Sequence, residues 1–359
     1  MKKIRYAVIG NGWISQEAFL PGVNQTGNSE VVALVSGQRE KAEKIAKFHG
    51  IPKVYDYGDY DAMLKRGEVD AVYIALPNSL HTDYAIRAAN AGVHALVEKP
   101  LATSIAESNT MIAAAAKAGV WLSTAYRLHT DEATLKVYDL IRSGAIGDPR
   151  HFISSFSFQI GAGNHRLLAK HWGGALQDIG VYCINSSRHV FAAEPVEVSA
   201  MDSMGQDDTR FTEVPATVSS LMRFPGGRIA SFTCSFGADV TDTYTIVGST
   251  GRITLINPHR FEVPRTIELS RGGKVETFDF PLTDNFSGQT AYFSDCILSG
   301  TKPEPDGEEG LADMIIMLAI EEAARTGQSQ KIKIPPRPTY ASMANMRSFP
   351  PVSHRLVLT

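Results

Sequence analysis

The feature that most constrains how this chain can fold is the alternation of short apolar runs and helical patterns in its first third. Five runs of mostly apolar residues are separated by segments in which apolar side chains recur at helical spacing. This alternation is the signature of repeated strand-helix-strand units, which build a parallel sheet. The expected strands are residues 4–9, 31–35, 71–76, 93–97 and 120–124, and the expected helices are residues 13–24, 39–49, 60–66, 82–91 and 105–118.

Beyond residue 125 the pattern changes to alternating runs that are typical of strands, with turns such as Pro225-Gly226-Gly227 between them. Many consecutive strands predict a large, open, mostly antiparallel sheet with helices on one face and a partner on the other. The expected strands begin at residue 151 and include 196–200, 216–224, 227–236, 243–247, 252–256, 265–269 and 275–280; the expected helices are 135–142, about 173–190, 289–298 and 308–324.

These patterns predict an α/β protein of two domains, which suits 359 residues at about 150 residues per domain. Residues 1–125 are expected to form a doubly wound parallel sheet, and residues 126–359 an α/β domain with the open sheet. The last part of the second domain contains Pro335-Pro336-Arg337-Pro338 and Pro350-Pro351. Because proline interrupts regular helix, this part is expected to be a tail or arm.

Composition argues against several classes of protein. The chain is 43% hydrophobic and 20% charged, with 35 Lys+Arg against 38 Asp+Glu, so neither a nucleic-acid surface nor a membrane surface is expected. No apolar run reaches about 18 residues, and the start is too interrupted for a secretory leader. The three cysteines, Cys183, Cys234 and Cys296, are far apart. They predict neither a disulfide framework nor a metal site, and a reducing cytoplasm is the expected location.

The first turn, Gly10-Asn11-Gly12-Trp13-Ile14-Ser15, stands directly between an expected strand and an expected helix. It has two of the three glycines of a dinucleotide-binding fingerprint, and Ser15 occupies the third position. Such a turn lets the backbone approach a pyrophosphate closely. An ordinary tight turn can also contain two glycines, but the strand and helix stand where the fingerprint requires them.

The end of the second strand, Ser36-Gly37-Gln38-Arg39, has no acidic residue to bind the ribose hydroxyl of NAD. A hydroxyl and a nearby guanidinium suit a 2′-phosphate instead, because Arg offers charge-assisted donors to phosphate oxygens. NADP(H) is therefore the preferred cofactor, with NAD(H) possible. The alternative is that Arg39 merely begins a helix and faces water.

Two further groups of polar residues stand near expected element ends. Glu98-Lys99-Pro100 follows a short apolar strand, where open α/β sheets bind ligands. Asp178 and Tyr182 are four residues apart on an expected helix, so they are predicted to share one face. Taken singly, each group has an ordinary interpretation, such as a solvated loop lysine or a core tyrosine bonded to an acid.

Together these elements resemble the Gfo/Idh/MocA oxidoreductase family, and within it the branch of glucose-fructose oxidoreductases and related aldose dehydrogenases. The resemblance extends from Ile4 to about Arg325. It is carried by Gly10-Asn11-Gly12, Leu76-Pro77-Asn78 with His81, Glu98-Lys99-Pro100-Leu101, Tyr126-Arg127-Leu128-His129 and the stretch from Gly173 to Tyr182.

The resemblance implies an N-terminal Rossmann domain, a C-terminal α/β domain whose open sheet forms a homodimer or homotetramer interface, and a sugar substrate. It implies that Lys99, Asp178 and Tyr182 face the sugar and the nicotinamide. The residues expected to contact the cofactor are Gly10, Asn11, Gly12, Trp13, Ile14, Ser36, Gln38, Arg39, Leu76, Pro77, Asn78, His81, Glu98, Lys99 and Arg127. The residues expected to line the sugar site are His165, Lys170, His171 and Trp172.

This sequence departs from the family in three places. Ser15 replaces the third glycine. Tyr182 stands where inositol-dehydrogenase-like members carry histidine, which argues against the polyol branch. The proline-rich tail is not a general family feature, and arm exchange between subunits is one role that it could have.

Oxidation of an alcohol requires a base for the hydroxyl proton while hydride leaves for the nicotinamide. Our hypothesis assigns this acid/base role to Tyr182. The pKa of its phenol is normally about 10, and a nearby ammonium such as Lys99 would lower that pKa. Asp178 would orient the substrate. Alternatives on the same scaffold are an NAD-dependent glycosidase that oxidises its substrate transiently, a non-catalytic nucleotide-sensing regulator, and an imine or biliverdin-type reductase.

Overall fold

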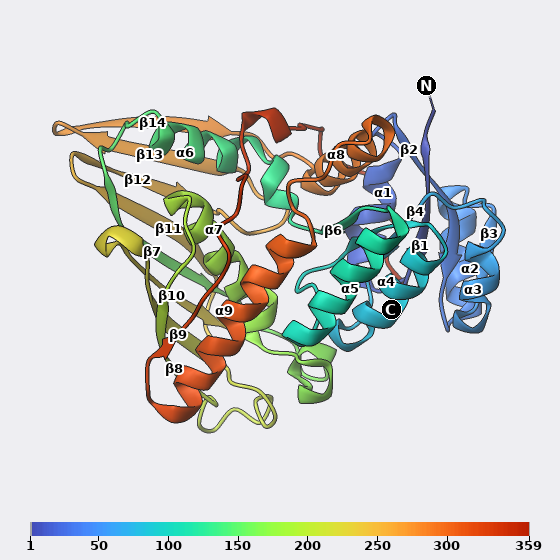
Figure 1. The fold of residues 1–359 in the computed structure, drawn as a ribbon, viewed down its shortest axis with the longest axis horizontal. Coiled ribbons are helices and arrows are strands. Elements are labelled where there is room, and N and C mark those ends of the chain that lie inside the picture. The colour runs from blue at the N-terminus through green and yellow to red at the C-terminus, as the bar shows by residue number, and fades with distance from the viewer. Residues whose placement is uncertain (1, 359) are drawn as a thin grey trace. The chain divides into compact units, whose positions relative to one another are not determined.

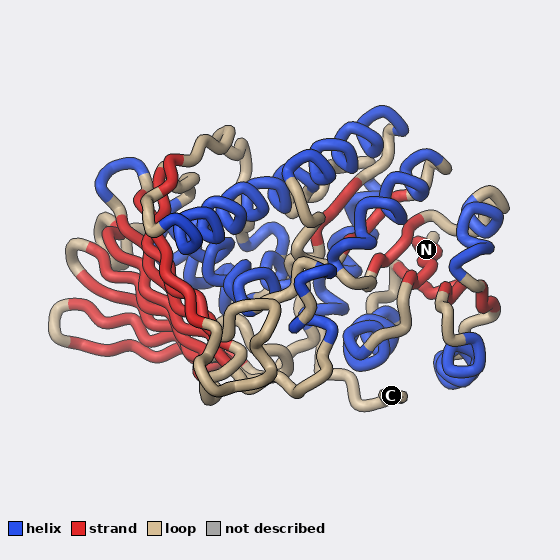
Figure 2. The backbone as a smooth tube through the Cα atoms, turned by 90° about the horizontal axis from the view of Figure 1, so that it is seen from below, coloured by secondary structure: helices blue, strands red, loops and turns tan. Residues whose placement is uncertain are grey.

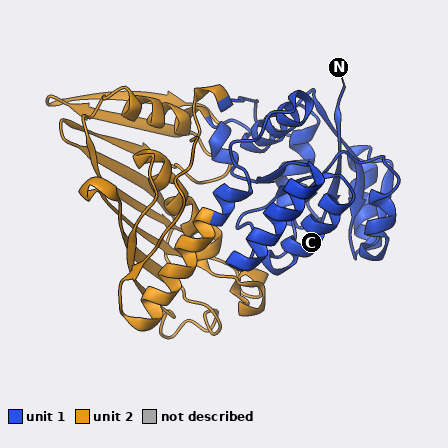
Figure 3. Ribbon diagram, viewed as in Figure 1, with its two compact units in different colours: residues 1–131, 283–311, 345–359 blue, residues 132–282, 312–344 orange. Residues whose placement is uncertain are grey.

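The computed structural model describes residues 2–358, and the chain divides into two compact units (Figure 3). Unit 1 comprises Met1–Asp131, Thr283–Leu311 and Asn345–Thr359, and unit 2 comprises Glu132–Leu282 and Ala312–Ala344. This division differs from the predicted boundary at residue 125, because two later segments of the chain return to pack with the first.

Unit 1 is built on a six-stranded parallel sheet of order β3-β2-β1-β4-β5-β6 (Figure 1). The strands are β1 (Ile4–Ile9), β2 (Ser29–Val35), β3 (Lys53–Tyr55), β4 (Ala71–Ile74), β5 (His94–Val97) and β6 (Leu122–Thr124). The helices are α1 (Leu20–Val23), α2 (Arg39–His49), α3 (Tyr60–Leu64), α4 (His81–Asn90), α5 (Ile105–Ala118) and α8 (Asn285–Ser299). The sequence pattern missed β3, which has only three residues.

The continuous apolar character of β1 follows from burial of both faces of this sheet. Tyr6 and Val8 belong to one buried cluster, whereas Ala7 and Ile9 belong to another. Because successive side chains of a strand point to opposite faces, a doubly covered sheet needs apolar residues at every position. The predicted parallel α/β arrangement is confirmed.

Helix α8 belongs to unit 1 although it lies more than 150 residues beyond the last strand of the sheet. Its Ser294 hydroxyl bonds the hydroxyls of Tyr6 (2.9 Å) and Ser29 (2.7 Å), and Phe293 is part of a buried cluster with β1. The helix starts four residues before the predicted start, because the side chain of Asp284 caps it by accepting from two backbone amides.

Unit 2 is built on a nine-stranded sheet of order β14-β13-β12-β11-β7-β10-β9-β8-β15, drawn in red in Figure 2. Its neighbouring strands pair antiparallel except β7 with β10, so the mostly antiparallel sheet is confirmed. The strands are β7 (Pro149–Ser157), β8 (Glu197–Ser203), β9 (Thr217–Arg223), β10 (Ile229–Ser235), β11 (Thr241–Gly248), β12 (Gly251–Ile256), β13 (Arg265–Arg271), β14 (Lys274–Phe280) and β15 (Gln330–Lys331).

The helices of unit 2 are α6 (Glu132–Arg142) and α7 (Val181–Phe191), and α9 (Gly307–Thr326) begins in unit 1 and ends in unit 2. In β12, Ile253 and Leu255 are fully buried while Arg252 is exposed. This alternation indicates a sheet with one covered face.

Two π-helical segments among residues 2–358 were not predicted. Segment η1 (Ser15–Phe19) lies close after the Gly10 turn, and η7 (Leu176–Gly180) lies directly before α7. Such segments are rare and are frequently found at functional sites. They therefore mark the two regions where candidate site residues gather.

The structure also bears on two expectations from composition. Cys183, Cys234 and Cys296 are buried free thiols. Within residues 2–358, every helix is too short or too polar to span a bilayer.

Candidate functional site

The Gly10 turn is tightly constrained by its surroundings. Gly10 has a φ of 92°, and a Cβ at this position would lie 2.6 Å from the carbonyl oxygen of Ala75. Only glycine fits such a position. Ser15 is buried and donates a 2.8 Å hydrogen bond from its hydroxyl to the Gly10 carbonyl. The serine at the third fingerprint position therefore closes the turn by a bond that glycine cannot make.

Asn11 links the turn to the end of β2. Its Oδ1 accepts a 2.8 Å bond from the hydroxyl of Ser36, which in turn accepts a 3.0 Å bond from the backbone amide of Gln38. The Nδ2 of Asn11 is buried and has no partner among the described residues. Because a buried unpaired donor is costly, this nitrogen marks a place where a ligand group would complete the site. The structure thus brings three predicted cofactor residues together.

Two other predicted cofactor residues of unit 1 are exposed. Arg39 is the first residue of α2, and its guanidinium forms ion pairs with Glu43 (2.8 Å) and Asp56 (3.6 Å). The side chain of Trp13 is 54% exposed. Exposed ion pairs contribute little to stability, so a phosphate can compete with these carboxylates for Arg39.

His81 connects the loop after β4 to the Glu98-Lys99-Pro100 loop. It is fully buried, and its two ring nitrogens lie 2.9 Å from the carbonyl oxygens of Leu76 and Pro100. Burial lowers the pKa of His81. This imidazole therefore holds two loops at the carboxyl edge of the sheet, while Leu76, Pro77 and Asn78 form the adjacent loop and the 3-10 turn η3 (Asn78–Leu80).

Glu98 is held by Tyr73 from the neighbouring strand. The Tyr73 hydroxyl donates a 2.6 Å bond to Glu98, and the Tyr73 ring stacks on Phe19 at 3.7 Å. Burial raises the pKa of Glu98, whereas Lys99 has the largest opposing influence. The carboxylate and the ammonium of this motif therefore interact, and Lys99 lies beside a partly buried acid.

Arg127 is buried against α8. Its Nη1 donates a 3.1 Å bond to the side-chain oxygen of Asn285, whose Nδ2 donates a 2.9 Å bond to Asp131. The guanidinium carbon lies 5.9 Å from the centre of the Phe286 ring. The sequence predicted Arg127 but not its partners, because α8 follows it by more than 150 residues.

In unit 2, Asp178 and Tyr182 lie on either side of the junction between η7 and α7. The predicted α-helical spacing between them applies only from Val181 onward, because Asp178 lies in the π-helical segment. Asp178 forms a 3.1 Å ion pair with the guanidinium of Arg166. The sequence analysis did not single out Arg166.

Tyr182 is only 9% exposed, and its ring contacts those of Phe156 and His259, with centroids 6.2 and 5.8 Å away; the latter two rings also contact each other. His259 is itself fixed: its Nδ1 lies 3.0 Å from Asp242 and its Nε2 lies 3.2 Å from the hydroxyl of Ser186. These groups were missed by the sequence analysis because they are distant in the chain and match no short motif.

The loop before η7 contains the predicted sugar-site residues His165, Lys170, His171 and Trp172. It includes the 3-10 turns η5 (His165–Leu167) and η6 (Ala169–His171). Burial lowers the pKa of His165. A Cβ at Gly173 would lie 2.3 Å from the carbonyl oxygen of Arg166. Gly173 therefore permits this loop to fold back closely on itself.

Glu321, from α9, ties this loop to the π-helical segment. It accepts from the indole nitrogen of Trp172, which lies 3.1 and 3.2 Å from its two oxygens, and from the side-chain amide of Gln177 at 2.6 Å. Burial raises the pKa of Glu321. These three side chains line a cavity of about 150 Å³ together with residues of 169–176, 202, 213–218 and 320–324. Glu321 is a site residue that the sequence analysis missed.

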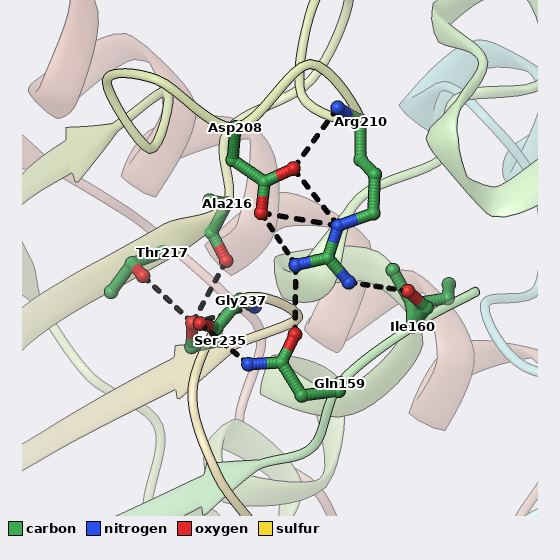
Figure 4. Close-up of polar contacts among 8 residues, drawn as sticks. All are labelled: Gln159, Ile160, Asp208, Arg210, Ala216, Thr217, Ser235 and Gly237. Atoms are coloured by element: carbon green, nitrogen blue, oxygen red, sulfur yellow. Dashed lines mark hydrogen bonds and ion pairs between the residues drawn. The ribbon is translucent and has the colours of Figure 1, made fainter. Parts of the chain in front are cut away.

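A second loop, whose own polar contacts are drawn in Figure 4, lies next to this region. Arg210 pairs with Asp208 and donates to the side chain of Gln159 (2.7 Å) and the carbonyl of Ile160 (2.6 Å), just beyond β7. Glu213, three residues after Arg210, accepts a 2.9 Å bond from the backbone amide of Ala169. The loop of Arg210 therefore braces the loop of the predicted sugar-site residues.

The candidate residues divide between the two units. All predicted cofactor residues, including Lys99, lie in unit 1, whereas Asp178, Tyr182, His165, Lys170, His171 and Trp172 lie in unit 2.

Comparison with known proteins finds a matching family model for each of two parts of the chain. Residues 4–126 match the family model described as the oxidoreductase family with an NAD-binding Rossmann fold, and residues 134–254 match the GFO/IDH/MocA C-terminal domain. The chain belongs to the Gfo/Idh/MocA oxidoreductase family.

Several of the similar proteins are enzymes that act on sugars, and others are dehydrogenases of dihydrobenzenediol. The chain is 31% identical to a D-xylose 1-dehydrogenase [NADP(+)] of Haloarcula marismortui, over 92% of this chain and 93% of that protein. It resembles the crystal structure of an aldose-aldose oxidoreductase from Caulobacter crescentus with a TM-score of 0.88, at 33% identity over 92% and 100% of the two chains. It also resembles a 3-ketoreductase from Actinomadura kijaniata in complex with NADP and TDP-benzene, with a TM-score of 0.81 and 30% identity over 90% and 98%.

Membership of the family confirms three predictions: the family itself, the Rossmann domain followed by an α/β domain, and the enzyme class. The protein is an oxidoreductase of this family with an NAD-binding Rossmann domain.

Proposed function

We propose that this protein is an NADP(H)-dependent oxidoreductase that transfers hydride to or from a sugar, an aldose or a related carbohydrate. The observation that carries the proposal is the fixed phenol of Tyr182, packed on His259 in a helix that begins just after the ion-paired Asp178. A phenol held in one orientation suits proton transfer, since a general acid or base must stay in place. The names of the similar enzymes support a sugar as substrate.

The residues of unit 1 suit a nicotinamide dinucleotide. Gly10 permits the tight turn, a Cβ at Gly12 would meet no atom within 4 Å, and Asn11 offers a buried unpaired donor. When bound, the cofactor supplies the group that accepts or donates hydride. The absence of a carboxylate from Ser36 to Gln38, with Arg39 next to them, supports NADP(H) over NAD(H).

In the proposed mechanism Tyr182 takes the hydroxyl proton of the sugar during oxidation and returns it during reduction. Asp178, with Arg166 as its partner, accepts hydrogen bonds from sugar hydroxyls and so orients the ring. Lys99 supplies a positive charge that binds a substrate oxygen.

A screen of aldoses, ketoses and 1,5-anhydro-sugars with both cofactors, followed by nicotinamide absorbance, tests this proposal. We expect turnover of at least one sugar, with greater kcat/KM for NADP(H). Release of sugar from a glycoside without a change in absorbance would favour the glycosidase. Cofactor binding without turnover of any sugar would favour a regulator, and turnover only of imines would favour an imine reductase.

We also propose that a second copy of the chain covers the exposed face of the nine-stranded sheet. Ile153 and Leu221 are 53% and 55% exposed and lie in one cross-strand row through Ser231, and Met201 of β8 is 80% exposed. Exposed apolar side chains in neighbouring strands are typical of an association surface.

Light scattering at several concentrations tests the assembly. We expect a dimer or tetramer for the natural protein and a smaller species for Leu221→Arg. The matched control is Val357→Arg, which changes an apolar residue that is 40% exposed and lies outside the sheet. A monomeric natural protein would rule the proposal out.

A further inference from the structure

The C-terminal segment, residues 346–358, packs on its own unit 1. The carbonyl of Phe349 accepts a 2.9 Å bond from the backbone amide of Asp284, and the carbonyl of Pro350 accepts a 2.9 Å bond from the side chain of Gln25. This segment is thus attached to the cap of α8 and to the residues after α1.

Further along, side chains of the segment contact two helices of the dinucleotide-binding domain. The imidazole of His354 stacks on Phe48 of α2, with ring centroids 4.2 Å apart and planes within 9°. The guanidinium of Arg355 lies 2.9 Å from the carboxylate of Glu17 in η1, and both side chains are about four-fifths buried. A partly buried ion pair and a ring stack indicate a specific arrangement rather than a loose tail.

The segment reaches the Gly10 turn through the buried amide of Gln16. The Oε1 of Gln16 accepts a 2.7 Å bond from the backbone amide of Leu358, and its Nε2 lies 3.2 Å from the Leu358 carbonyl. The same Nε2 donates to the carbonyl of Asn11 at 2.8 Å and lies 3.3 Å from that of Gly12. Gln16 is fully buried. One side chain therefore joins the C-terminal segment to two residues of the turn.

We propose that the C-terminal segment is a strap that fixes the dinucleotide-binding turn, with Gln16 as the positioning residue between them. The strap holds Gln16, Gln16 holds the carbonyls of Asn11 and Gly12, and the turn then presents the unpaired Nδ2 of Asn11 to the ligand. A turn ordered before binding loses less conformational entropy when the cofactor binds. The strap therefore tightens cofactor binding without entering the reaction.

This inference rests on the proposed cofactor, and it gives the proline-rich tail a role within one chain. It also predicts that an apolar residue of equal size would not replace Gln16. Such a residue would remove the side-chain partner of the Asn11 carbonyl and of the Leu358 amide, and buried unpaired backbone groups are costly.

Leu358→Pro tests the strap most directly, because proline lacks the backbone amide that donates to Gln16. The control is Leu358→Ala, which keeps that amide and removes only the side chain. We expect the Kd for NADPH, measured by fluorescence titration, to rise about three- to tenfold in Leu358→Pro and less in Leu358→Ala. The kcat at saturating cofactor should stay unchanged.

A second pair of variants distinguishes a specific effect on the Gly10 turn from a general loosening of the C-terminal segment. Arg355→Gln removes the ion pair beside the turn, and Arg347→Gln removes a comparable ion pair of the same segment with Asp295 (2.9 Å). We expect a raised Kd for Arg355→Gln only. Equal effects of both, or a Kd unchanged in Leu358→Pro, would overturn the strap.

Hydrogen exchange of the Gly10 to Gly12 amides in the cofactor-free protein distinguishes failure of the strap from failure of the proposed function. Faster exchange in Leu358→Pro than in Leu358→Ala supports the strap even if the natural protein binds no dinucleotide. Equal exchange rates would contradict it even if the natural protein binds NADPH tightly.

Discussion

The two π-helical segments of this protein are built alike but are held differently. Each has a buried glutamine at its second residue, Gln16 in η1 and Gln177 in η7. The Gln16 amide is satisfied by uncharged backbone groups of the Gly10 turn and of Leu358. The Gln177 amide instead donates to the carboxylate of Glu321, which also accepts from Trp172.

Because of this difference, the contact of Gln16 in unit 1 and the contact of Gln177 in unit 2 are expected to respond differently to pH. A contact between an amide and backbone groups does not titrate, so the cofactor turn is expected to be independent of pH. The Gln177 contact instead includes the partly buried carboxyl of Glu321, whose pKa is raised by burial, so this contact changes with pH. Variants in unit 1 and in unit 2 should therefore alter cofactor binding and sugar binding separately.

The largest effect is expected from removal of the Tyr182 hydroxyl in unit 2. Tyr182→Phe should lower kcat roughly 100- to 10,000-fold, because it removes the proposed acid/base, and should leave the Kd for NADPH unchanged. Steady-state kinetics and cofactor titration measure the two quantities. The control is Tyr244→Phe, since Tyr244 also packs on His259 but has no proposed role. Near-normal turnover of Tyr182→Phe would remove Tyr182 from the mechanism.

A pair of glycine variants tests whether cofactor and sugar binding are separate. Gly10→Ala should raise the Kd for NADPH about 10- to 100-fold, because its Cβ would approach the Ala75 carbonyl and backbone strain costs about 1–3 kcal/mol. Gly173→Ala should raise the KM for the sugar by a similar factor, through its contact with the Arg166 carbonyl. Each variant serves as the control for the other. Equal changes of the Kd for NADPH and the KM for the sugar in both variants would show that cofactor binding and sugar binding are not separate.

Glu321→Gln tests the pH-sensitive contact. Glutamine keeps one oxygen that can accept from Trp172 and Gln177, but it loses the second oxygen and the charge that strengthen these bonds, so the KM for the sugar should rise about three- to tenfold. Glu322→Gln is the control, because Glu322 is exposed and pairs only locally with Arg325. A KM unchanged in Glu321→Gln, or raised equally in the control, would contradict this role.

The stability of Glu321→Gln should also depend on pH differently from that of the natural protein. Because burial raises the pKa of Glu321, the folded protein keeps this proton at pH values where the unfolded chain, with a pKa near 4.3, has lost it. The folded state then binds more protons, and stability falls as pH rises from the unfolded pKa to the folded one. Melting temperatures of Glu321→Gln relative to the natural protein should therefore increase across this range. A constant difference would argue against the raised pKa.

The smallest expected effects concern cofactor choice at Arg39. Arg39→Ala should reduce the preference for NADP(H) over NAD(H), since it removes the proposed 2′-phosphate partner. Glu43→Gln should increase that preference about two- to threefold, because it frees the guanidinium from one competing carboxylate. Ratios of kcat/KM for the two cofactors measure both effects. A preference for NAD(H) in the natural protein would refute the assignment.

The sequence predicted more of the fold than of the site. Periodicity identified five of the six strands of unit 1 because both faces of that sheet are buried, which requires continuous apolar runs. It missed β3 and placed the start of α8 four residues late, because three residues carry little periodicity and the Asp284 cap precedes the apolar pattern. The motif spacing grouped Asn11, Ser36 and Gln38, and they do lie together in the structure, since a strand, a turn and a helix determine where such residues lie.

The amino-acid sequence by itself determined the strand and helix order, the family, and the residue types at the Gly10 turn and in the stretch from Gly173 to Tyr182. Only the tertiary structure decided which distant groups hold these residues: Asn285 beside Arg127, His259 beside Tyr182, Glu321 beside Trp172 and Gln177, and Leu358 beside Gln16. The physical reason is that local patterns record the burial and backbone needs of neighbouring residues. Partners separated by 77 to 342 residues leave no such pattern, because they meet only after the chain has folded.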